Sequence, residues 1–537
     1  MEDNGREKIS PQLVWSRYQK GVNYNSTIDL YGTVEENEEF FVGKQWGELY
    51  VTAPDLDKPV INFLQRVVSY FVSNITTDAL GIRCRFFNTP KEQAKQAERI
   101  IHAQLEQCIE DNDLNGDAKD AVRDAAVDGD ACYHVYFDPT APSGQTLQGL
   151  CRIERIPNTD VYFANRQSDD VERQPWIIIA SRKLVEEVRE IVRQAGGDPE
   201  QVRADTAEYE STIAQQDDTE RVTLLTMYYR RDGTIWRDQC TQTAQVTPET
   251  DMEYRLYPIA WMPWEKQRGS YHGVSCITAL KPNQIALNKS YAMALKQQRD
   301  LAYPKIIYNT AQFPDGWSNK IGPVGVSGDP KEAATSLTAS ADVPASVFTM
   351  VDRLLTQSRE MMGASDASLG NVNPDNTSAI IAVQQATAMP LELKKRQFQQ
   401  MVEKVVRSML DVISCTYGAR EICVADEVGN EAMVLFDWGS LKTEMLKLSV
   451  DIGDANYWDP NTQATMLERL LQNRIIPDPI LFLEHMPDGL LKDKDRLIAQ
   501  LKEAQNNAMQ QMSSGMPPDA AGGGQGAVPV PAMQTGL

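Results

Sequence analysis

The sequence has no long apolar run. Its densest apolar stretch covers only residues 67–72, whereas a membrane-spanning helix needs about 20 apolar residues. The first seven residues are mostly charged or polar and contain no apolar core, so no secretory signal peptide is expected. We therefore expect a protein that does not span a membrane and that is made in a cytoplasm. With 42% hydrophobic residues it can bury a sizeable core.

Motifs for metal, nucleotide and covalent chemistry are also missing from the sequence. The eight cysteines include no CxxC pair, and none of the four histidines has another histidine four residues away. Gly322, Gly325 and Gly328 lack the spacing of a phosphate-binding loop, and no Gly-Lys-Ser/Thr follows them. No Gly-x-Ser-x-Gly elbow occurs either. We expect reduced thiols, structural histidines and no cofactor.

One segment partly matches a calcium-binding loop. Asp111, Asp113, Asn115 and Gly116 stand at positions 1, 3, 5 and 6 of such a loop. Position 12 should be a glutamate that binds the ion with both oxygens, but it is Val122. We interpret the segment as a polar turn between two helices, with a weak cation site as the alternative.

The chain is acidic, with a net charge of −22. Tight DNA binding relies on Lys and Arg side chains that neutralise phosphates, so this chain should not grip DNA over its whole surface. An acidic wall could still enclose DNA without holding it, and the charge could equally serve only solubility. Asp128 with Asp130, or Asp451 with Asp454, form no recognised two-metal constellation, which makes a nuclease a weak alternative.

The first 130 residues predict helices. Ser10 followed by Pro11 is typical of a helix start. Further helices are predicted after Pro59, after Pro90 and over residues 116–128. The helix after Pro59 carries an apolar stripe at spacings of three and four. Its members are Val60, Leu64, Val67, Phe71 and Ile75.

The next 110 residues predict strands, because apolar residues there recur at every second position. The predicted strands cover residues 131–137, 150–156, 161–164, 176–180, 222–229 and 234–237. The last two form a hairpin around Asp232-Gly233. Together with the preceding helices, they indicate an α+β fold.

A helix predicted over residues 277–302 carries two different faces. Leu280, Leu287, Tyr291 and Leu295 form the apolar face. A basic stripe lies on another face and consists of Lys281, Lys289, Lys296 and Arg299. The stripe is either a solvated surface or a contact with a neighbouring subunit or with DNA phosphates.

The rest of the chain alternates breaks and helices. Residues 303–345 break the helix, with short β-like pieces at 305–308 and 324–326, and residues 346–362 form the next helix. A small polar loop over residues 363–376 precedes a long helix over 377–416, which Pro390 should kink or interrupt. A hairpin at 422–436 around Gly429-Asn430, a strand at 446–452 and helices after Asp459 and Asp478 and over 488–512 follow. We expect disorder in residues 513–537, which are rich in Gly and Pro.

This order of elements resembles the portal (head-to-tail connector) proteins of tailed double-stranded DNA bacteriophages. The likeness spans roughly residues 40–510 and rests on loose patterns. The stretches that carry it are Trp46–Tyr50 with Pro59–Val68, Trp261–Trp264 with Gly269–Ser275, Gln284–Ser290, Leu369–Ala379 and Val450–Asp478.

The resemblance implies a ring-forming α+β protein with a mixed wing domain, long stem helices, a small β-containing clip and a helical C-terminal crown. It divides the chain into an N-terminal segment (1–29), the first part of the wing (30–276), stem helix 1 (277–302), the clip (303–345), stem helix 2 (346–362), a tunnel loop (363–376), a kinked helix with the second part of the wing (377–455), the crown (456–512) and a disordered tail (513–537).

The resemblance also implies a function and partners. The ring, usually of twelve subunits, would sit at one capsid vertex of the virion and pass double-stranded DNA during packaging and ejection. It would dock the terminase packaging motor, head-tail adaptor proteins and the major capsid protein. ATP hydrolysis would belong to the motor, so this chain would not be an enzyme. The alternatives are another structural virion or adaptor protein and, less favoured, a DNA-processing enzyme.

The same resemblance suggests two groups of contact residues besides the basic stripe. The tunnel loop would face the channel with Asp366, Ser368, Asn371, Asn373, Asp375 and Asn376. The clip would meet its partners with Asp315, Trp317 and Lys320.

Overall fold

The computed structural model describes most of the first 452 residues. The described ranges are 9–47, 56–76, 82–85, 91–206, 220–302, 305–313, 326, 329–337, 345–361, 377–425, 431–444 and 449–452, with isolated residues at 467, 469, 482, 483, 498 and 501. The chain divides into two units, and nearly all described residues belong to the first, which comprises residues 1–424 and 432–453. The second unit comprises residues 425–431 and 454–537.

Two helices open the described chain. Helix α1 (Pro11–Thr27) begins at Ser10, whose hydroxyl accepts a hydrogen bond from the Leu13 amide at 3.3 Å. This confirms the predicted start, since a serine cap followed by proline satisfies the first helical turn. Helix α2 (Leu30–Val42) ends at Gly43, whose φ of 92° is the left-handed conformation that favours glycine.

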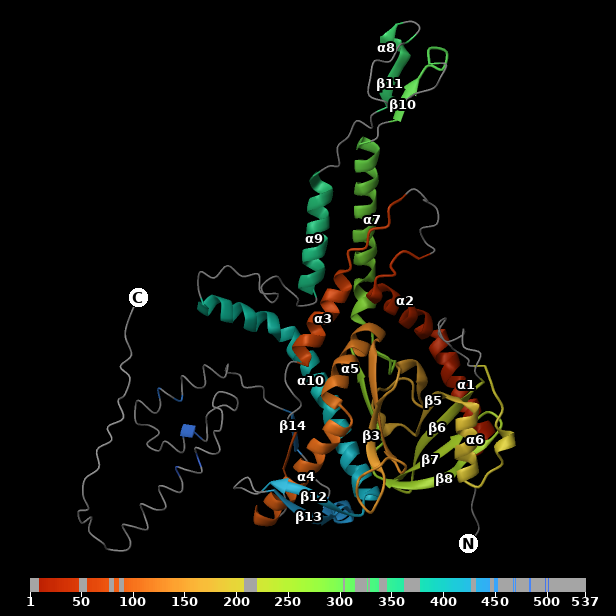
Figure 1. Cartoon of the computed structure of the whole chain (residues 1–537), viewed down its shortest axis with the longest axis vertical. Helices are drawn as coiled ribbons and strands as arrows, with labels where there is room; N and C mark the ends of the chain where they lie inside the picture. Colours follow the sequence, from red (N-terminus) through yellow and green to blue (C-terminus); the bar gives the residue numbers. More distant parts are fainter. Residues whose placement is uncertain are drawn as a thin grey trace, which may run out of the picture. The chain divides into compact units, whose positions relative to one another are not determined.

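The main hydrophobic core lies between helices and a three-stranded antiparallel sheet in the order β3-β2-β9. The strands are β2 (Asp130–Asp138), β3 (Leu150–Arg155) and β9 (Ile259–Pro263). The helices are α3 (Phe63–Ile75), α4 (Lys91–Asp111), α5 (Leu114–Asp128) and α10 (Thr377–Thr416). Helix α10 contacts β2, β9 and α3, while α5 contacts α3 and β2 (Figure 1).

A five-stranded antiparallel sheet follows the order β4-β5-β6-β7-β8. Its strands are β4 (Val161–Phe163), β5 (Trp176–Leu184), β6 (Arg221–Arg231), β7 (Thr234–Cys240) and β8 (Gln245–Tyr254). Helix α1 contacts β4 and β6, and helix α6 (Val185–Gln194) contacts β5, β6 and β8 (Figure 1). Short 3-10 turns lie at Asn158–Asp160, Val171–Arg173 and Pro199–Gln201.

Helix α7 (Cys276–Ala302) packs against α9 (Ala345–Met361) along part of its length. Between them in the sequence, β10 (Lys305–Tyr308) pairs antiparallel with β11 (Ala334–Leu337), next to the short helix α8 (Pro330–Ala333). The first unit is completed by paired strands β12 (Ala419–Ala425) and β13 (Glu431–Asp437), a 3-10 turn at Trp438–Ser440, α11 (Leu441–Glu444), and β14 (Ser449–Ile452), which pairs with β1 (Ile82–Arg85).

Most predicted elements are confirmed, with some corrections. The helix over 377–416 matches α10, but it runs across Pro390 without the interruption that we considered. Val60 precedes α3 and is 40% exposed, so its assignment to the apolar stripe was wrong. The sequence patterns missed α2, α6, β8 and β9. The tunnel loop, the Gly429-Asn430 turn, the piece at 324–325, nearly all of the crown and the tail lie outside the described residues.

Candidate functional site

The N-terminal half of α7 is held by polar side chains from three directions, and we call this region the α7 base (residues 275–291). The Ser275 hydroxyl accepts from the Thr278 amide at 3.2 Å and so caps the helix start. The buried Asn37 amide of α2 donates to the Val127 carbonyl and to the Thr278 hydroxyl, both at 2.9 Å. One buried side chain therefore ties α2, the end of α5 and the start of α7 together.

A second polar network fixes α7 to the segment before α3. Gln284 accepts from the Phe63 amide at 3.2 Å and donates to the Ile61 carbonyl at 2.8 Å and to Asn288 Oδ1 at 3.0 Å. Asn288 in turn donates to Gln45 Oε1 at 2.7 Å. All three amides are at least 97% buried. Buried amides that lack partners are costly, so this network permits one position of α7 and disfavours others.

The apolar side chains of α7 are buried at the start of the helix and become more exposed toward its end. Leu280 and Leu287 are each 1% exposed at the α7 base, where Asn283 donates to the buried Ser358 hydroxyl of α9 at 3.0 Å. Beyond the base, Met293 is 63% and Leu295 is 38% exposed. The predicted apolar face is therefore confirmed in the first half of the helix, whereas Leu295, its last member, is partly exposed.

The basic stripe of α7 partly meets acids of the same chain. Lys281 Nζ lies 2.6 Å from Glu36 and 5.7 Å from the centre of the Phe40 ring, both on α2. Arg299 lies 3.5 Å from Asp57. Lys289 is exposed and Lys296 is half-buried. At least two of the four predicted residues thus take part in ion pairs within the subunit, which supports a structural role for part of the stripe.

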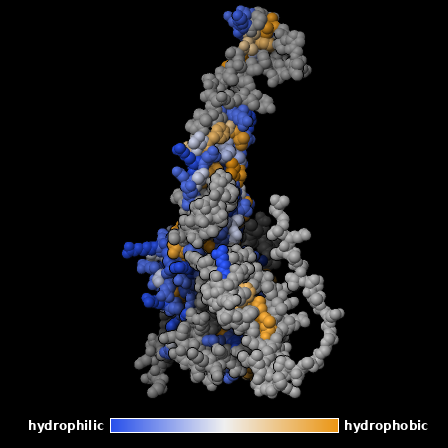
Figure 2. Space-filling model, turned by 90° about the vertical axis from the view of Figure 1, so that its left-hand side faces the viewer, coloured by the Kyte–Doolittle hydropathy of each residue, from blue (hydrophilic) through white to orange (hydrophobic). Residues whose placement is uncertain are grey.

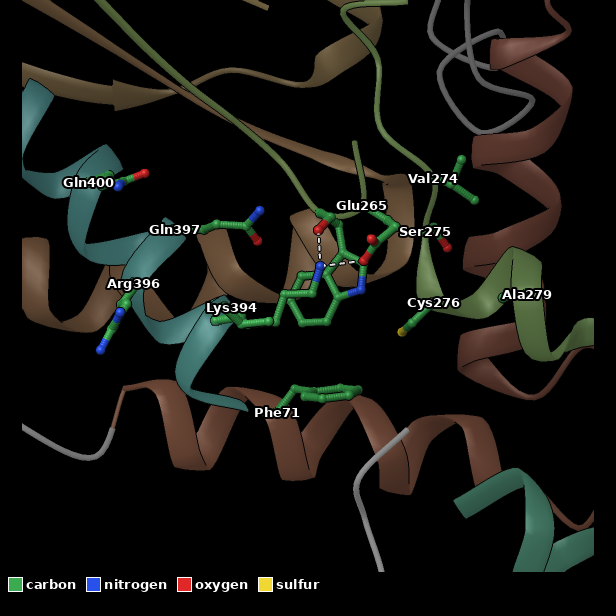
Figure 3. A pocket seen from close by; sticks show the side chains of 12 residues that line it. Phe71, Glu265, Val274, Ser275, Cys276, Ala279, Lys394, Arg396, Gln397 and Gln400 are labelled. Atoms are coloured by element: carbon green, nitrogen blue, oxygen red, sulfur yellow. Dashed lines mark hydrogen bonds and ion pairs between the residues drawn. The ribbon is translucent and has the colours of Figure 1, made fainter. Parts of the chain in front are cut away.

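A cavity of about 550 Å³ lies where α3, the start of α7 and α10 meet. Lys394 of α10 reaches across it to Glu265, with Nζ 2.6 Å from a carboxylate oxygen, and donates to the Trp264 carbonyl (Figure 3). The same ammonium lies 5.0 Å from the centre of the Trp264 ring, within the range of a cation–π contact. Phe71 of α3 also lines the cavity.

This cavity offers little for catalysis. Its lysine is paired with a carboxylate, and burial raises the pKa of its Cys276 thiol to about 12, so that the thiol stays protonated and unreactive. Among the described residues, no three His, Cys, Asp or Glu side chains converge to hold a metal ion. Neither the paired Lys394 nor the protonated Cys276 is therefore an activated nucleophile.

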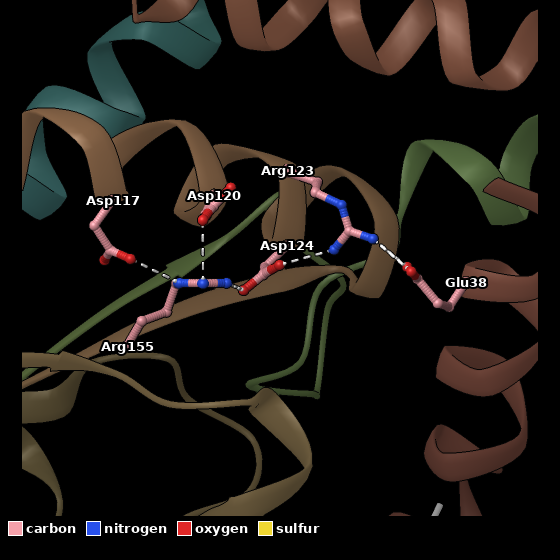
Figure 4. Close-up of polar contacts among 6 residues, drawn as sticks. All are labelled: Glu38, Asp117, Asp120, Arg123, Asp124 and Arg155. Carbon is pink, nitrogen blue, oxygen red and sulfur yellow. Dashed lines mark hydrogen bonds and ion pairs between the residues drawn. The ribbon is translucent and has the colours of Figure 1, made fainter. Parts of the chain in front are cut away.

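A chain of charges links α2, α5 and β3 near the α7 base (Figure 4). One guanidinium nitrogen of Arg123 donates to both carboxylate oxygens of Glu38, at 2.5 and 2.6 Å. Another nitrogen of Arg123 lies 3.3 Å from Asp124. Asp124 pairs with Arg155, which lies within 3.4 Å of two further aspartates of α5, Asp117 and Asp120. Burial raises the pKa of Asp124, and Arg155 partly offsets this.

The calcium-like segment forms the turn between α4 and α5. Asp113 has a left-handed φ of 45° and caps α5 by accepting from the Gly116 amide at 3.3 Å. Asn112 donates to the carbonyls of Cys108 and Cys151 at 2.7 and 3.1 Å. These contacts support our interpretation of a polar turn between two helices.

Two of the described histidines, His272 and His134, are placed as structural residues. His272 is 2% exposed and lies 2.8 Å from Asp130, which also accepts from the Gly273 amide at 2.7 Å. His134 lies 2.9 Å from the Tyr228 hydroxyl, and burial lowers its pKa to about 3, which keeps it neutral. Both side chains hold segments of the core together.

The remaining predicted contact residues lie outside the described residues. They are Asp366, Ser368, Asn371, Asn373, Asp375 and Asn376 of the tunnel loop and Asp315, Trp317 and Lys320 of the clip. The structure shows a set of residues that sequence reasoning overlooked, namely Glu36, Asn37, Gln45, Gln284, Asn288 and Lys394. The one available signal was the polar pair at positions 284 and 288, beside the apolar face of a helix.

A protein-family model described as "Phage P22-like portal protein" matches residues 23–457, which is most of the chain. No curated protein matches the sequence. Among the described residues, no helix is both long and apolar enough to cross a membrane.

Proposed function

The chain belongs to the P22-like phage portal protein family, and from that premise we propose that its copies close into a ring around a DNA channel at one capsid vertex. DNA would pass through the ring during packaging and ejection. Twelve is the subunit number that we propose, because the family resemblance implies it. In this assembly α7 and α9 act as the stem, and residues 303–345 act as the clip.

The observation that carries this proposal is the exposed apolar surface on both stem helices. Met293 and Leu295 of α7 are 63% and 38% exposed, and Phe348 and Met350 of α9 are 48% and 55% exposed. In Figure 2, orange hydrophobic side chains interrupt the hydrophilic surface at the height where Figure 1 draws α7 and α9. Met293 and Leu295, like Phe348 and Met350, are two positions apart and therefore point to different sides of their helix. In a ring each subunit has a neighbour on either side, and these neighbours would cover exposed apolar groups on both sides.

The basic residues of the stem fit the same assembly. Lys289 and Lys296 lie in the part of α7 that also carries Met293 and Leu295. We therefore propose that they contact either acidic groups of the neighbouring copy or phosphates of DNA in the channel. A net charge of −22 disfavours tight binding of DNA, as a channel for passing DNA requires.

The other predicted parts remain proposals on the family premise. The tunnel loop would face the channel, the clip would dock the packaging motor and later the tail adaptors, and residues 456–512 would form the crown. The chain would act in the virion, after assembly in the host cytoplasm, as a structural protein and not as an enzyme. The polar networks of the α7 base support a structural role, since they fix a long helix in place.

To test this proposal, one exposed apolar residue of the stem is replaced by a glutamate, and the fraction of oligomer is determined from the native mass of the variant. Phe348→Glu should lower the fraction of oligomer, because a carboxylate cannot be buried in an apolar contact. Leu184→Glu is the matched control: Leu184 is 46% exposed, close to the 48% of Phe348, but lies on β5. Equal oligomer fractions for Phe348→Glu and Leu184→Glu would contradict the proposed stem contact.

A further inference from the structure

One hydrogen bond sets the register between the two stem helices. Asn283 of α7 donates to the Ser358 hydroxyl of α9 at 3.0 Å, so these two residues lie at the same height of the stem. Helix α7 leads away from the α7 base toward β10, and α9 returns from β11, so the two helices run antiparallel (Figure 1). Each residue of a helix adds about 1.5 Å to the height. Residues that are equally far from this bond on the two helices are therefore level with each other.

Two pairs of exposed residues are level in this register. Met293 lies ten residues beyond the bonded residue of α7, and Phe348 lies ten residues before the bonded residue of α9, so both are about 15 Å up the stem from the bond. Lys289 and Asp352 are each six residues from it, at about 9 Å. Met293 is 63% and Phe348 is 48% exposed, and Lys289 and Asp352 are exposed as well. Each apolar group is thus level with another apolar group, and each charge with a charge of opposite sign.

The members of each pair point to opposite sides of the two helices. Both helices are right-handed and turn by about 100° per residue, so ten residues up the stem the side-chain direction has turned by the same angle on each, about 80° short of whole turns. Because the two bonded residues point at each other, Met293 and Phe348 then lie on opposite sides of the helix pair. The same reasoning separates Lys289 from Asp352. One copy therefore does not join these residues, whereas two neighbouring copies can.

We propose that the side of α7 with Lys289 and Met293 packs against the side of α9 with Phe348 and Asp352 in the next copy of the ring. This inference rests on the proposed ring and names the surfaces that form its stem contact. On each helix the apolar and the charged residue are four positions apart and so share one side. A rotation about an axis parallel to the stem changes no heights, so it brings Met293 to Phe348 and Lys289 to Asp352.

The chemistry of the two surfaces is complementary. A methionine thioether packs favourably on an aromatic ring, and a lysine beside an aspartate of the neighbour fixes the register of the contact. The two surfaces differ, so each copy presents one of them to each neighbour, and contacts of this kind close into rings. The pairing assigns Lys289 to the neighbouring copy. It does not include Lys296, because the residue of α9 at that height is the uncharged Ala345.

Cysteine cross-linking of the full chain tests the pairing. Met293→Cys combined with Phe348→Cys, under a mild oxidant, should give a ladder of covalent species at whole-number multiples of 60.2 kDa in a denaturing gel without reductant. Each single substitution should give only the monomer band. Leu295→Cys with Phe348→Cys should do the same, because Leu295 is two positions from Met293 and points to a different side. All variants carry Cys423→Ser, which removes an exposed native thiol.

A charge exchange tests the ion pair separately. Lys289→Glu should raise the protein concentration at which half of the chains are assembled by about tenfold, because two carboxylates then face each other. Adding Asp352→Lys should restore the wild-type concentration. Lys296→Glu is the matched control: it reverses a lysine of the same helix, and Asp352→Lys should not rescue any effect that it has.

The outcomes distinguish this pairing from the ring itself. If the wild type is an oligomer but the cysteines at positions 293 and 348 give no ladder and Asp352→Lys gives no rescue, the pairing is wrong and the proposed ring stands. A wild-type native mass of 60.2 kDa would refute the ring and the pairing together. If Lys289→Glu assembles like the wild type but fails to package DNA, Lys289 contacts DNA phosphates and the ion pair with Asp352 is refuted.

Discussion

Replacing Gln284 with methionine should loosen the α7 base. Gln284 is fully buried and makes three hydrogen bonds, to the Phe63 amide, the Ile61 carbonyl and Asn288. Methionine fills a similar volume but forms none of these bonds. A buried hydrogen bond contributes about 1 kcal/mol net, so the free energy of local opening should fall by about 3 kcal/mol. That change corresponds to an increase of about 150-fold in the open population.

Hydrogen–deuterium exchange measures this opening directly. Amides of residues 61–66 and 280–290 should exchange about 150-fold faster in Gln284→Met than in the wild type, while amides of the five-stranded sheet should be unaffected. Gln298→Met is the control, because Gln298 lies on the same helix but is exposed. If both variants exchange at the wild-type rate around residues 61–66, the network does not hold α7 and our account of the α7 base is wrong.

Three further predictions concern charge and thiols. Arg155→Met should lower the free energy of unfolding by about 1–3 kcal/mol, and with it the melting temperature, because Asp124 then keeps only Arg123 as an ion-pair partner. The loss should be smaller in 1 M salt, which screens ion pairs, and an unchanged melting temperature would refute the network. Burial raises the pKa of Asp238 to about 6, so the protonated carboxyl contributes fully to stability below pH 3.8, and this contribution is lost as the pH rises through 6. In a series of melting temperatures from pH 4 to 7, Asp238→Asn should remove the part of the decline in stability that Asp238 causes. A thiol reagent should modify the exposed Cys423 far faster than Cys108, whose buried thiol has a pKa raised to about 11, as peptide mapping would show.

The sequence predicted the long helices well, because each of them buries apolar residues that recur every three or four positions. The predicted end of the helix at residue 416 matches α10, where Phe398, Met401, Val405 and Met409 are all at most 3% exposed. It left open whether Pro390 kinks or interrupts this helix, and α10 is not interrupted there. Proline disfavours a helix interior by about 3 kcal/mol, but the burial of the later residues stabilises α10 as a whole.

The polar contacts of the α7 base could not be predicted in the same way. Gln45 and Asn288 are 243 positions apart, and Glu36 and Lys281 are 245 apart. Periodicity reports which face of an element is apolar, but it does not report which distant side chain meets a given amide. Asp128 shows the same limit. It was considered only as half of an acid pair with Asp130, whereas its place at the wall of a cavity depends on α1, α2 and the loop before α7.

Negative-stain electron microscopy of the purified protein, together with its native mass, decides whether copies of this chain form a ring around a channel. We expect rings with a central hole and a mass that is a whole-number multiple of 60.2 kDa, with twelve as the expected multiple. Particles without a hole and with a mass of 60.2 kDa, at protein concentrations and salt conditions that keep the chain folded, would show that the chain does not form the proposed ring.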